Sequence, residues 1–273
     1  MTTCPSCPGP GEIPDTPLLR YFRSPLFNGP RGKTWGADRI AELTRLLDNS
    51  GELASKFADS VADVERCYRN YQPFYPREHT FHEDQSRDAT VDVARRLATR
   101  DVWEVGNNSR LNFRYLDREI EIARSNPGPV KPPGGTLLID LFLANASDRT
   151  PILCEVKRFN DQCAFYGLIQ LLTQATYAAT ASQRERLVLL GSQPAFVLRE
   201  AIPGKPGRLD LYILLVEPKK GKPYDDISPK AILLSQVLVR DPRVRSKIRR
   251  IEWIEGRYDG KDGLVLSDLR ARA

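Results

Sequence analysis

The chain of 273 residues carries 41 Lys and Arg against 35 Asp and Glu, which gives a net charge of +6. Hydrophobic residues make up 41% of the chain and charged residues 28%. These proportions exclude wholesale disorder, collagen and a long coiled coil, and they predict a packed core. No apolar run approaches the roughly 18 residues that span a membrane, and the N-terminus lacks the basic and apolar regions of a secretory signal. We therefore expect a cytoplasmic protein without a membrane partner.

Residues 1–35 are rich in Pro and Gly, which predicts an extended, loosely ordered arm with no catalytic role. This arm holds Cys4 and Cys7 in an isolated CxxC motif, and the two histidines of the chain, His79 and His82, each follow 75 residues later. Zinc sites usually consist of two close ligand pairs, so an inert tail is the favoured interpretation and metal binding is the alternative. The five scattered cysteines do not indicate a disulfide framework.

Helical periodicity dominates the next part of the chain. Between residues 36 and 77 the apolar residues recur at helical intervals with a break at 49–51, which predicts an N-terminal helical segment made of two helices. A further helix is expected to begin near Thr80 or Ser86 and to end at Thr99. It opens a core region that we place at residues 78–225.

The core region then changes to short β-type runs separated by turn residues. We expect strands at 118–123, 136–144, 151–158, 186–190 and 209–217. A helix at 163–180 follows the third strand. Three successive strands favour an antiparallel meander, and strand, helix and strand favour a right-handed crossover with parallel pairing. The sequence thus predicts an α/β fold with a mixed central sheet flanked by helices, followed by a C-terminal extension at 226–273 with one helix, 228–239, and an irregular end.

One of these strands places a carboxylate among large apolar residues. Because side chains alternate along a strand, Asp140 shares a face with Leu138 and Phe142. An ionised carboxylate removed from water costs several kcal/mol unless a cation or hydrogen-bond donors compensate it. We therefore expect a compensating group to face Asp140.

The next strand supplies such groups. Glu155 and Lys157 are separated by one residue and point to the same face, and the turn-like segment before them predicts a hairpin that brings them beside Asp140. Hard divalent cations such as Mg²⁺ bind one or two carboxylates together with waters and phosphate oxygens. A lysine beside the metal can help to deprotonate the attacking water and can stabilise charge on a phosphoryl group. The three residues are thus suited to phosphodiester hydrolysis.

The chain has Asp140 on one expected strand, Glu155-Val156-Lys157 on the next strand and then a helix. This arrangement resembles the signature of the PD-(D/E)xK superfamily of restriction-endonuclease-like nucleases. The resemblance covers residues 78–217 and implies an αβββαβ core. It also implies that Asp140 and Glu155 bind Mg²⁺, or Mn²⁺ in its place, and that Lys157 assists the nucleophilic water. The alternative is a surface hairpin in which Glu155 and Lys157 form a salt bridge, which leaves the apolar surroundings of Asp140 unexplained.

The helix expected at 163–180 contains Gln170, which is similar in position to a glutamine that lies near the metal in the RecB-type branch of this superfamily. That branch often has Tyr four positions later, whereas this chain has Gln174 there and its tyrosine at Tyr177. The resemblance implies a role for Gln170 in the site. A merely exposed helical residue is the alternative.

Many members of the superfamily also carry an acid on the helix before the first strand. Glu83 is the expected metal ligand of this kind, with Asp88 and Asp92 as competitors. Because acids are also common near helix N-termini for electrostatic reasons, a structural role is the alternative for each of them. The histidines nearby do not form HExxH, and the chain lacks GxxxxGK[ST], GxGxxG and GxSxG, so zinc proteases, nucleotide hydrolases, dinucleotide oxidoreductases and α/β-hydrolases have no support.

A basic cluster near the C-terminus contains a single acid, Asp241. Its six members are Arg240, Arg243, Arg245, Lys247, Arg249 and Arg250. Such a cluster suits phosphate contacts with nucleic acid, and a solvated basic face or a protein-binding surface is the alternative.

These features together predict a Mg²⁺-dependent nuclease that hydrolyses DNA, with RNA as the alternative substrate. The alternative function is a catalytically inactive nuclease-fold protein that acts as a nucleic-acid-binding or assembly subunit. By analogy, nucleases of this size serve restriction, antiphage defence or mobile-element systems. A homo-oligomer, or a protein partner from the same system, is compatible with the chain.

Overall fold

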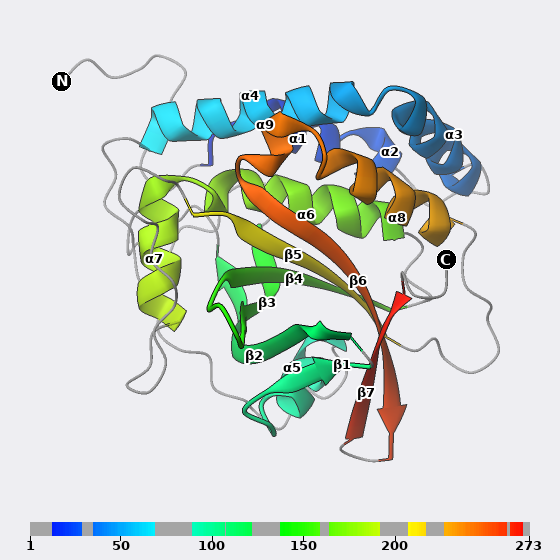
Figure 1. The fold of residues 1–273 in the computed structure, drawn as a ribbon. Helices are drawn as coiled ribbons and strands as arrows, with labels where there is room; N and C mark the ends of the chain where they lie inside the picture. Colours follow the sequence, from blue (N-terminus) through cyan, green and yellow to red (C-terminus); the bar gives the residue numbers. More distant parts are fainter. Residues whose placement is uncertain are drawn as a thin grey trace.

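The computed structural model describes most of the chain. Its described residues are 13–28, 35–68, 89–106, 108–121, 137–158, 164–191, 207–216, 227–260 and 263–269. Figure 1 shows one twisted sheet running through these residues, with helices on both of its faces. Within these ranges, no helix combines the length and the apolar character that crossing a membrane requires.

In the described part of the chain, seven strands form the sheet, and each pairs with its neighbours in sequence. They are β1 (Trp103–Val105), β2 (Asn108–Glu121), β3 (Leu138–Asn145), β4 (Pro151–Arg158), β5 (Leu209–Val216), β6 (Ile248–Asp259) and β7 (Gly263–Asp268). Pairing is antiparallel from β1 to β4, parallel from β4 to β6, and antiparallel between β6 and β7. This confirms the predicted meander and the α/β class with a mixed sheet, whereas the parallel crossover leads from β4 to β5 and not to a strand at 186–190.

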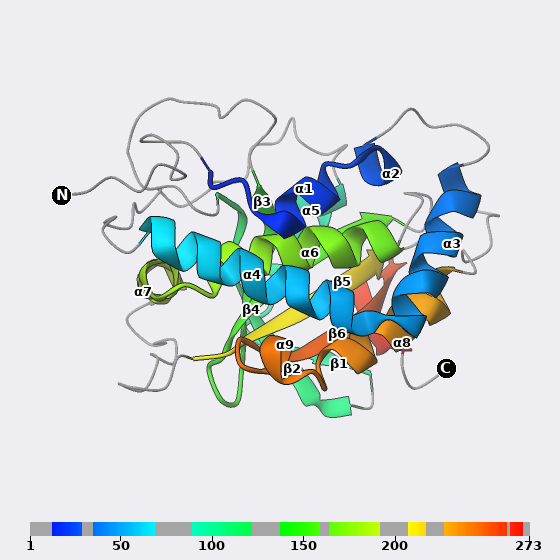
Figure 2. The same ribbon diagram turned by 90° about the horizontal axis from the view of Figure 1, so that it is seen from above.

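The helices form two layers on one face of the sheet and one layer on the other. They are α1 (Pro17–Phe22), α2 (Pro25–Asn28), α3 (Trp35–Asp48), α4 (Ser50–Tyr68), α5 (Ala89–Leu97), α6 (Ala164–Ala178), α7 (Ala181–Gly191), α8 (Ile227–Leu238) and α9 (Pro242–Arg245). On one face α6 and α8 contact the sheet and α1, α3 and α4 pack over them, whereas α5 lies on the opposite face (Figures 1 and 2). The two helices predicted between 36 and 77 and the helices predicted at 163–180 and 228–239 are confirmed, and the expected start of α5 lies outside the described residues.

The core divides into two clusters, one on each face of the sheet. The larger cluster joins α1, α4, α6 and α8 to the sheet, and the smaller joins α5 to β1, β2 and β7. Nearly all side chains of α6 are buried, because this helix lies between the sheet and the outer helices. A helix that is buried all round must satisfy its polar side chains inside the protein, which makes each of its glutamines informative.

The N-terminal segment is more regular than the sequence predicted. In its described part, 13–28, α1 and α2 replace the expected extended arm. The Thr16 side chain caps α1 by accepting a hydrogen bond from the backbone N–H of Leu19, and Pro17 fits the first helical position because no partner is needed there for an N–H. Leu18 and Leu19 are fully buried in the larger cluster. The frequent prolines therefore concealed a short helix that belongs to the core.

The strand predicted at 186–190 is wrong, because these residues belong to α7. Its buried positions are Gln183, Arg184, Leu187 and Val188. Residues at this spacing share one face of a helix, and a short apolar run such as 187–190 fits either a strand or a helix. Together α6 and α7 therefore make the crossover from β4 to β5.

The C-terminal residues, predicted as an irregular end, contribute two strands to the same sheet. β6 pairs with β5 along the whole length of β5, and β7 pairs with β6. The Asn108 amide in β2 donates to the Asp268 carboxylate in β7 over 2.9 Å, so the two ends of the twisted sheet approach each other. Charged residues such as Glu252 and Glu255, which are buried in β6, interrupted the apolar pattern and obscured this strand. The sheet thus continues past the predicted boundary at 226.

Candidate active site

The turn between β3 and β4 is closed by a side chain. Asn145 Oδ1 accepts hydrogen bonds from the backbone N–H groups of Ser147 and Asp148, at 3.0 and 2.9 Å. Asparagine is well suited to this task, because its short side chain can satisfy backbone donors two and three residues further on. The closed turn sets the register of the hairpin, so the positions opposite each other in β3 and β4 are defined.

The ladder between β3 and β4 ends one residue before the two acids. The last paired residues are Leu141 and Cys154. Beyond them the backbone N–H of Val156 donates to Asp140 Oδ2 over 2.8 Å, so a carboxylate replaces the opposite backbone as its acceptor. Asp140 and Glu155 therefore meet where the two strands separate, which confirms the predicted hairpin.

Asp140 is partly exposed, and its surroundings disfavour a negative charge on its carboxyl. Burial raises the pKa of its carboxyl well above the usual value, and the neighbouring charge of Glu155 raises this pKa further. The Lys157 ammonium and the Val156 N–H lower the pKa of Asp140 but do not outweigh these effects. Two carboxylates in such proximity favour the binding of a proton or of a metal cation.

Glu155 is fully buried, and both of its carboxylate oxygens have partners. Lys157 Nζ lies 2.5 Å from Oε1, and Gln174 Nε2 donates to Oε2 over 3.2 Å. One partner comes from the same strand and the other comes from α6. The carboxylate is therefore held in a single orientation beside Asp140.

Lys157 connects the two acids to α6. Its ammonium donates to Gln170 Oε1 over 3.3 Å and lies 5.3 Å from the centre of the Tyr166 ring. Burial tends to lower the pKa of Lys157, but the charges of Glu155 and Asp140 outweigh burial and raise this pKa above its usual value. Lys157 thus stays charged at neutral pH and acts as the cation that both acids require.

The close approach of α6 to β4 depends on a glycine. A Cβ added at Gly167 would lie 3.3 Å from Lys157 Cγ and 3.9 Å from Glu155 Cγ. The first distance is shorter than an ordinary van der Waals contact, so a larger residue would displace the lysine stem. Gly167 therefore allows the helix to pack directly over the acidic pair.

Sequence reasoning identified one of the two α6 glutamines that reach this pair. Gln170, predicted as a site residue, contacts Lys157 as described above. Gln174 was noted only as a departure from a family pattern, and Tyr166 was not considered. The spacing of four residues places Gln170 and Gln174 on the same helix face, and this signal could have drawn attention to Gln174.

The donor set fits a hard divalent cation. Asp140 and Glu155 supply carboxylate oxygens side by side, and burial together with the neighbouring Glu155 raises the pKa of Asp140. Mg²⁺ needs only one or two carboxylates, because waters and substrate phosphates complete its octahedron. Within the described ranges, no group of three or more His, Cys, Asp or Glu side chains is placed to hold a metal. Asp140 and Glu155 match the number of carboxylates that a bound Mg²⁺ would need.

The other metal ligands considered from the sequence do not join this pair in the described part of the chain. Those outside the described ranges are Glu83, Asp88, His79, His82, Cys4 and Cys7. Asp92 lies on α5, on the opposite face of the sheet from α6, and forms an ion pair with Arg96 at 3.2 Å. Asp92 is thus engaged away from the acidic pair.

Asp210, near the beginning of β5, binds two arginines of the basic cluster. It is fully buried, and its carboxylate accepts hydrogen bonds from Arg249 Nε and Arg250 Nε, each at 2.7 Å. Arg249 also pairs with Asp148 in the turn between β3 and β4. Both arginines therefore fasten β6 to its neighbours, a structural task that the prediction of nucleic-acid contacts did not include.

The other four members of the basic cluster lie in α9 or within two residues of its ends. Lys247 forms an ion pair with Glu65 of α4 at 2.7 Å, and Arg243 pairs with Asp241 at the same distance. The remaining members, Arg240 and Arg245, are exposed. They retain the access to solvent that contact with a phosphate backbone requires.

The strand pairing places one end of the basic cluster relative to the acidic pair. Arg250 is level with Asp210, and Asp210 is level with Ile152, three residues before Glu155 on β4. The Arg250 guanidinium also lies 5.8 Å from the ring of Tyr212, which belongs to the cluster on the α5 face of the sheet. This part of the basic cluster therefore lies apart from the two acids.

Replacement of Arg249 by Ala should lower the free energy of unfolding far more than replacement of Arg245 by Ala. Arg249→Ala should lower the free energy of unfolding by about 2 kcal/mol, because buried Asp210 loses the charged hydrogen bonds from one of its two arginine partners. Arg245→Ala should change it by less than about 0.5 kcal/mol, as for most exposed residues. Urea denaturation of the two variants measures this difference, and equal stabilities would contradict the structural role of Arg249.

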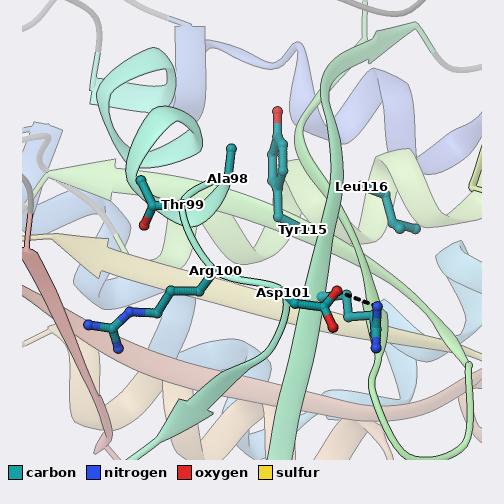
Figure 3. Close-up of a pocket in the computed structure, with 7 residues that line it drawn as sticks. Ala98, Thr99, Arg100, Asp101, Tyr115 and Leu116 are labelled. Carbon is teal, nitrogen blue, oxygen red and sulfur yellow. Dashed lines mark hydrogen bonds and ion pairs between the residues drawn. The ribbon is translucent and has the colours of Figure 1, made fainter.

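A surface hollow of about 330 Å³ lies between the end of α5 and β2. Figure 3 shows Tyr115 projecting away from Asp101, whose dashed line marks the ion pair with Arg114. The polar residues that line this hollow also include Thr99 and Arg100. Neither Asp140 nor Glu155 borders this hollow, so it is separate from the candidate active site.

The candidate site thus combines groups from three elements that follow one another in the chain. β3 and β4 provide two carboxylates and one ammonium, and α6 provides two carboxamides. Glu155 and Lys157 alternate along β4 with Cys154 and Val156 of the cluster on the α5 face, so both lie on the face of the sheet that α6 covers. No protein-family model matches the chain, and no curated protein and no solved structure is significantly similar to it.

Proposed function

We propose that the chain is a Mg²⁺-dependent nuclease of the PD-(D/E)xK type that hydrolyses phosphodiester bonds in DNA. The observation that carries the proposal is the meeting of Asp140, Glu155 and Lys157 where β3 and β4 separate. A salt bridge on a surface hairpin does not account for it, because Glu155 is fully buried and the pKa of Asp140 is raised. When the short strand β1 and the helix α7 are left aside, the order α5, β2, β3, β4, α6, β5 supports the αβββαβ core that the resemblance implies.

Each residue has a defined task in this proposal. Asp140 and Glu155 hold Mg²⁺, which supplies Lewis-acid polarisation of the scissile phosphate when it is bound. Lys157 orients the attacking water and stabilises the charge that develops on the phosphoryl oxygens. Gln170 accepts a hydrogen bond from the Lys157 ammonium and so limits its movement.

Contacts with the DNA backbone are proposed for the exposed residues Arg240 and Arg245. The ion-paired members of the basic cluster are less suited to this role, because each would have to leave a carboxylate partner. A restriction, antiphage defence or mobile-element system is the biological setting that we propose for such a nuclease.

Metal-dependent cleavage is the direct test. The full chain is incubated with supercoiled plasmid, linear duplex, single-stranded DNA and RNA, in the presence of Mg²⁺, Mn²⁺ or EDTA. We expect DNA cleavage with either metal and none with EDTA. Glu155→Gln should lose this activity, because the amide supplies no anionic ligand. Glu104→Gln, which alters an exposed acid of β1, is the matched control and should cut like wild type.

Two outcomes would contradict the proposal. One is that no substrate is cut in any metal, and the other is that Glu155→Gln cuts as well as wild type. Salt-dependent DNA binding without cleavage would favour the non-catalytic alternative, since phosphate contacts release counterions whether or not a bond is broken.

A further inference from the structure

Gln174 joins β3 to β4 through hydrogen bonds beside the acidic pair. Its side chain is fully buried on α6. The amide nitrogen Nε2 donates to the backbone carbonyl of Leu138 in β3 over 2.6 Å and to Glu155 Oε2 in β4 over 3.2 Å. Both partners can only accept, so the amide must present its nitrogen to them.

The other amide atom of Gln174 shows that this orientation has a cost. Oε1 is buried without a hydrogen-bond partner in the described part of the protein. A buried acceptor without a hydrogen-bond partner destabilises the folded protein. If the amide were reversed, its oxygen would face Leu138 O and the Glu155 carboxylate. That orientation is less favourable, because all of these atoms are acceptors. In the folded protein Oε1 therefore stays without a partner, while Nε2 donates to acceptors on both β3 and β4.

These two hydrogen bonds lie where the backbone ladder no longer holds the strands. The ladder ends at Leu141 and Cys154, before the acidic pair. Past that point the Val156 N–H fixes Asp140, and Gln174 fixes Glu155 relative to the backbone of β3. The separation of the two carboxylates therefore depends on side-chain links.

We propose that Gln174 is a positioning residue of the metal site, one that fixes the Glu155 carboxylate relative to Asp140 so that both face a divalent cation. This inference rests on the proposed function and adds a residue to it. Groups that orient a metal ligand typically contribute about 10- to 100-fold to metal affinity or activity. Gln174 should contribute in this range without touching the metal or the substrate.

Manganese binding to the full chain tests the inference. Gln174→Met keeps the volume and removes both hydrogen bonds, so the Mn²⁺ dissociation constant, measured by electron paramagnetic resonance of free Mn²⁺, should rise about 10- to 100-fold. The metal concentration for half-maximal cleavage should rise by a similar factor, and KM for DNA should stay unchanged. Thr173→Val is the matched control, because Thr173 is also fully buried on α6 but donates to Ile169 O of its own helix.

A second variant keeps the test decisive if Gln174→Met does not fold, as judged by circular dichroism. Gln174→Asn retains the amide but is one methylene too short to hold both partners, and it should weaken Mn²⁺ binding in the same direction. Unchanged Mn²⁺ affinity in either folded variant, or an equal loss in Thr173→Val, overturns the role of Gln174 alone. A wild-type protein that neither binds Mn²⁺ nor cuts DNA overturns the proposed function as well.

Discussion

Asp140→Asn should abolish metal-dependent cleavage and, at the same time, make the metal-free protein more stable. The cleavage is lost because an amide is a weak ligand for Mg²⁺, which prefers anionic oxygen. The stability rises because Asn removes a charge that burial and Glu155 both disfavour. Asn also keeps an oxygen that can accept the hydrogen bond from Val156 N–H, so the local geometry survives.

The pH dependence of this stability follows from the raised pKa of Asp140. The folded protein retains the Asp140 proton over a pH range in which the unfolded chain has already lost it. Stability therefore falls as pH rises from the unfolded-state pKa, about 3.9 for Asp, to the folded-state pKa, and the full cost persists above the latter. The advantage of Asp140→Asn should thus be about 1 kcal/mol at neutral pH and should disappear in acid.

Thermal and urea denaturation in EDTA and in Mg²⁺ measure both effects. Mg²⁺ should raise the melting temperature of the wild type, because it binds only the folded state, and should leave Asp140→Asn unchanged. Asp59→Asn, which alters an exposed acid on α4, is the control and should behave like wild type. If Asp140→Asn is less stable than wild type in EDTA at neutral pH, the acidic pair is not under the electrostatic strain described above.

Lys157→Met should cause the largest loss of stability among single changes at the site. Glu155 is fully buried and the Lys157 side chain is 15% exposed, so removal of the ammonium leaves buried negative charge without its cation. Breaking a buried ion pair in this way costs about 3 kcal/mol. The raised pKa of Lys157 means that its contribution is fully present below the unfolded-state pKa of about 10.4 and is lost only as pH rises through the folded-state value. Measurements at neutral pH therefore report the whole effect.

Cleavage by Lys157→Met should fall by about 100- to 1,000-fold, the range for loss of one group that stabilises charge in the transition state. Loss of stability and loss of cleavage can be separated by a second change. Adding Glu155→Gln to Lys157→Met should restore most of the stability, because the uncompensated carboxylate is removed, but it should restore no cleavage. Urea denaturation of the two single variants and the double variant measures the coupling free energy. Additive losses would show that Lys157 and Glu155 do not interact in solution.

The sequence predicted the elements that carry the acids best. β4 has the predicted bounds, 151–158, because its apolar run lies between turn residues and breakers. α6 and α8 differ from prediction by one or two residues at each end. Prediction failed where one pattern fits two structures, as in α7, or where charged residues interrupt a strand, as in β6.

The partners of the charged residues could also be predicted from the sequence only in part. That Glu155 and Lys157 share a face follows from their spacing, and that Asp140 joins them follows from a short turn, so the sequence predicted this cluster. The partners of Arg249 and Arg250 lie 39 and 40 residues away in Asp210, and no local pattern indicates such a pairing. A basic run therefore predicted a binding surface where the fold uses two of its arginines internally.

The sequence by itself determined that Asp140, Glu155 and Lys157 can meet, since spacing within a strand and across a short hairpin depends only on local backbone geometry. The tertiary structure decided what surrounds them. Gln174 bonds to Leu138, 36 residues away, only because α6 packs over the sheet between β4 and the outer helices. A buried charge needs a compensating partner, and packing often brings that partner from a distant part of the chain. The order of the residues along the chain does not reveal which residue it will be.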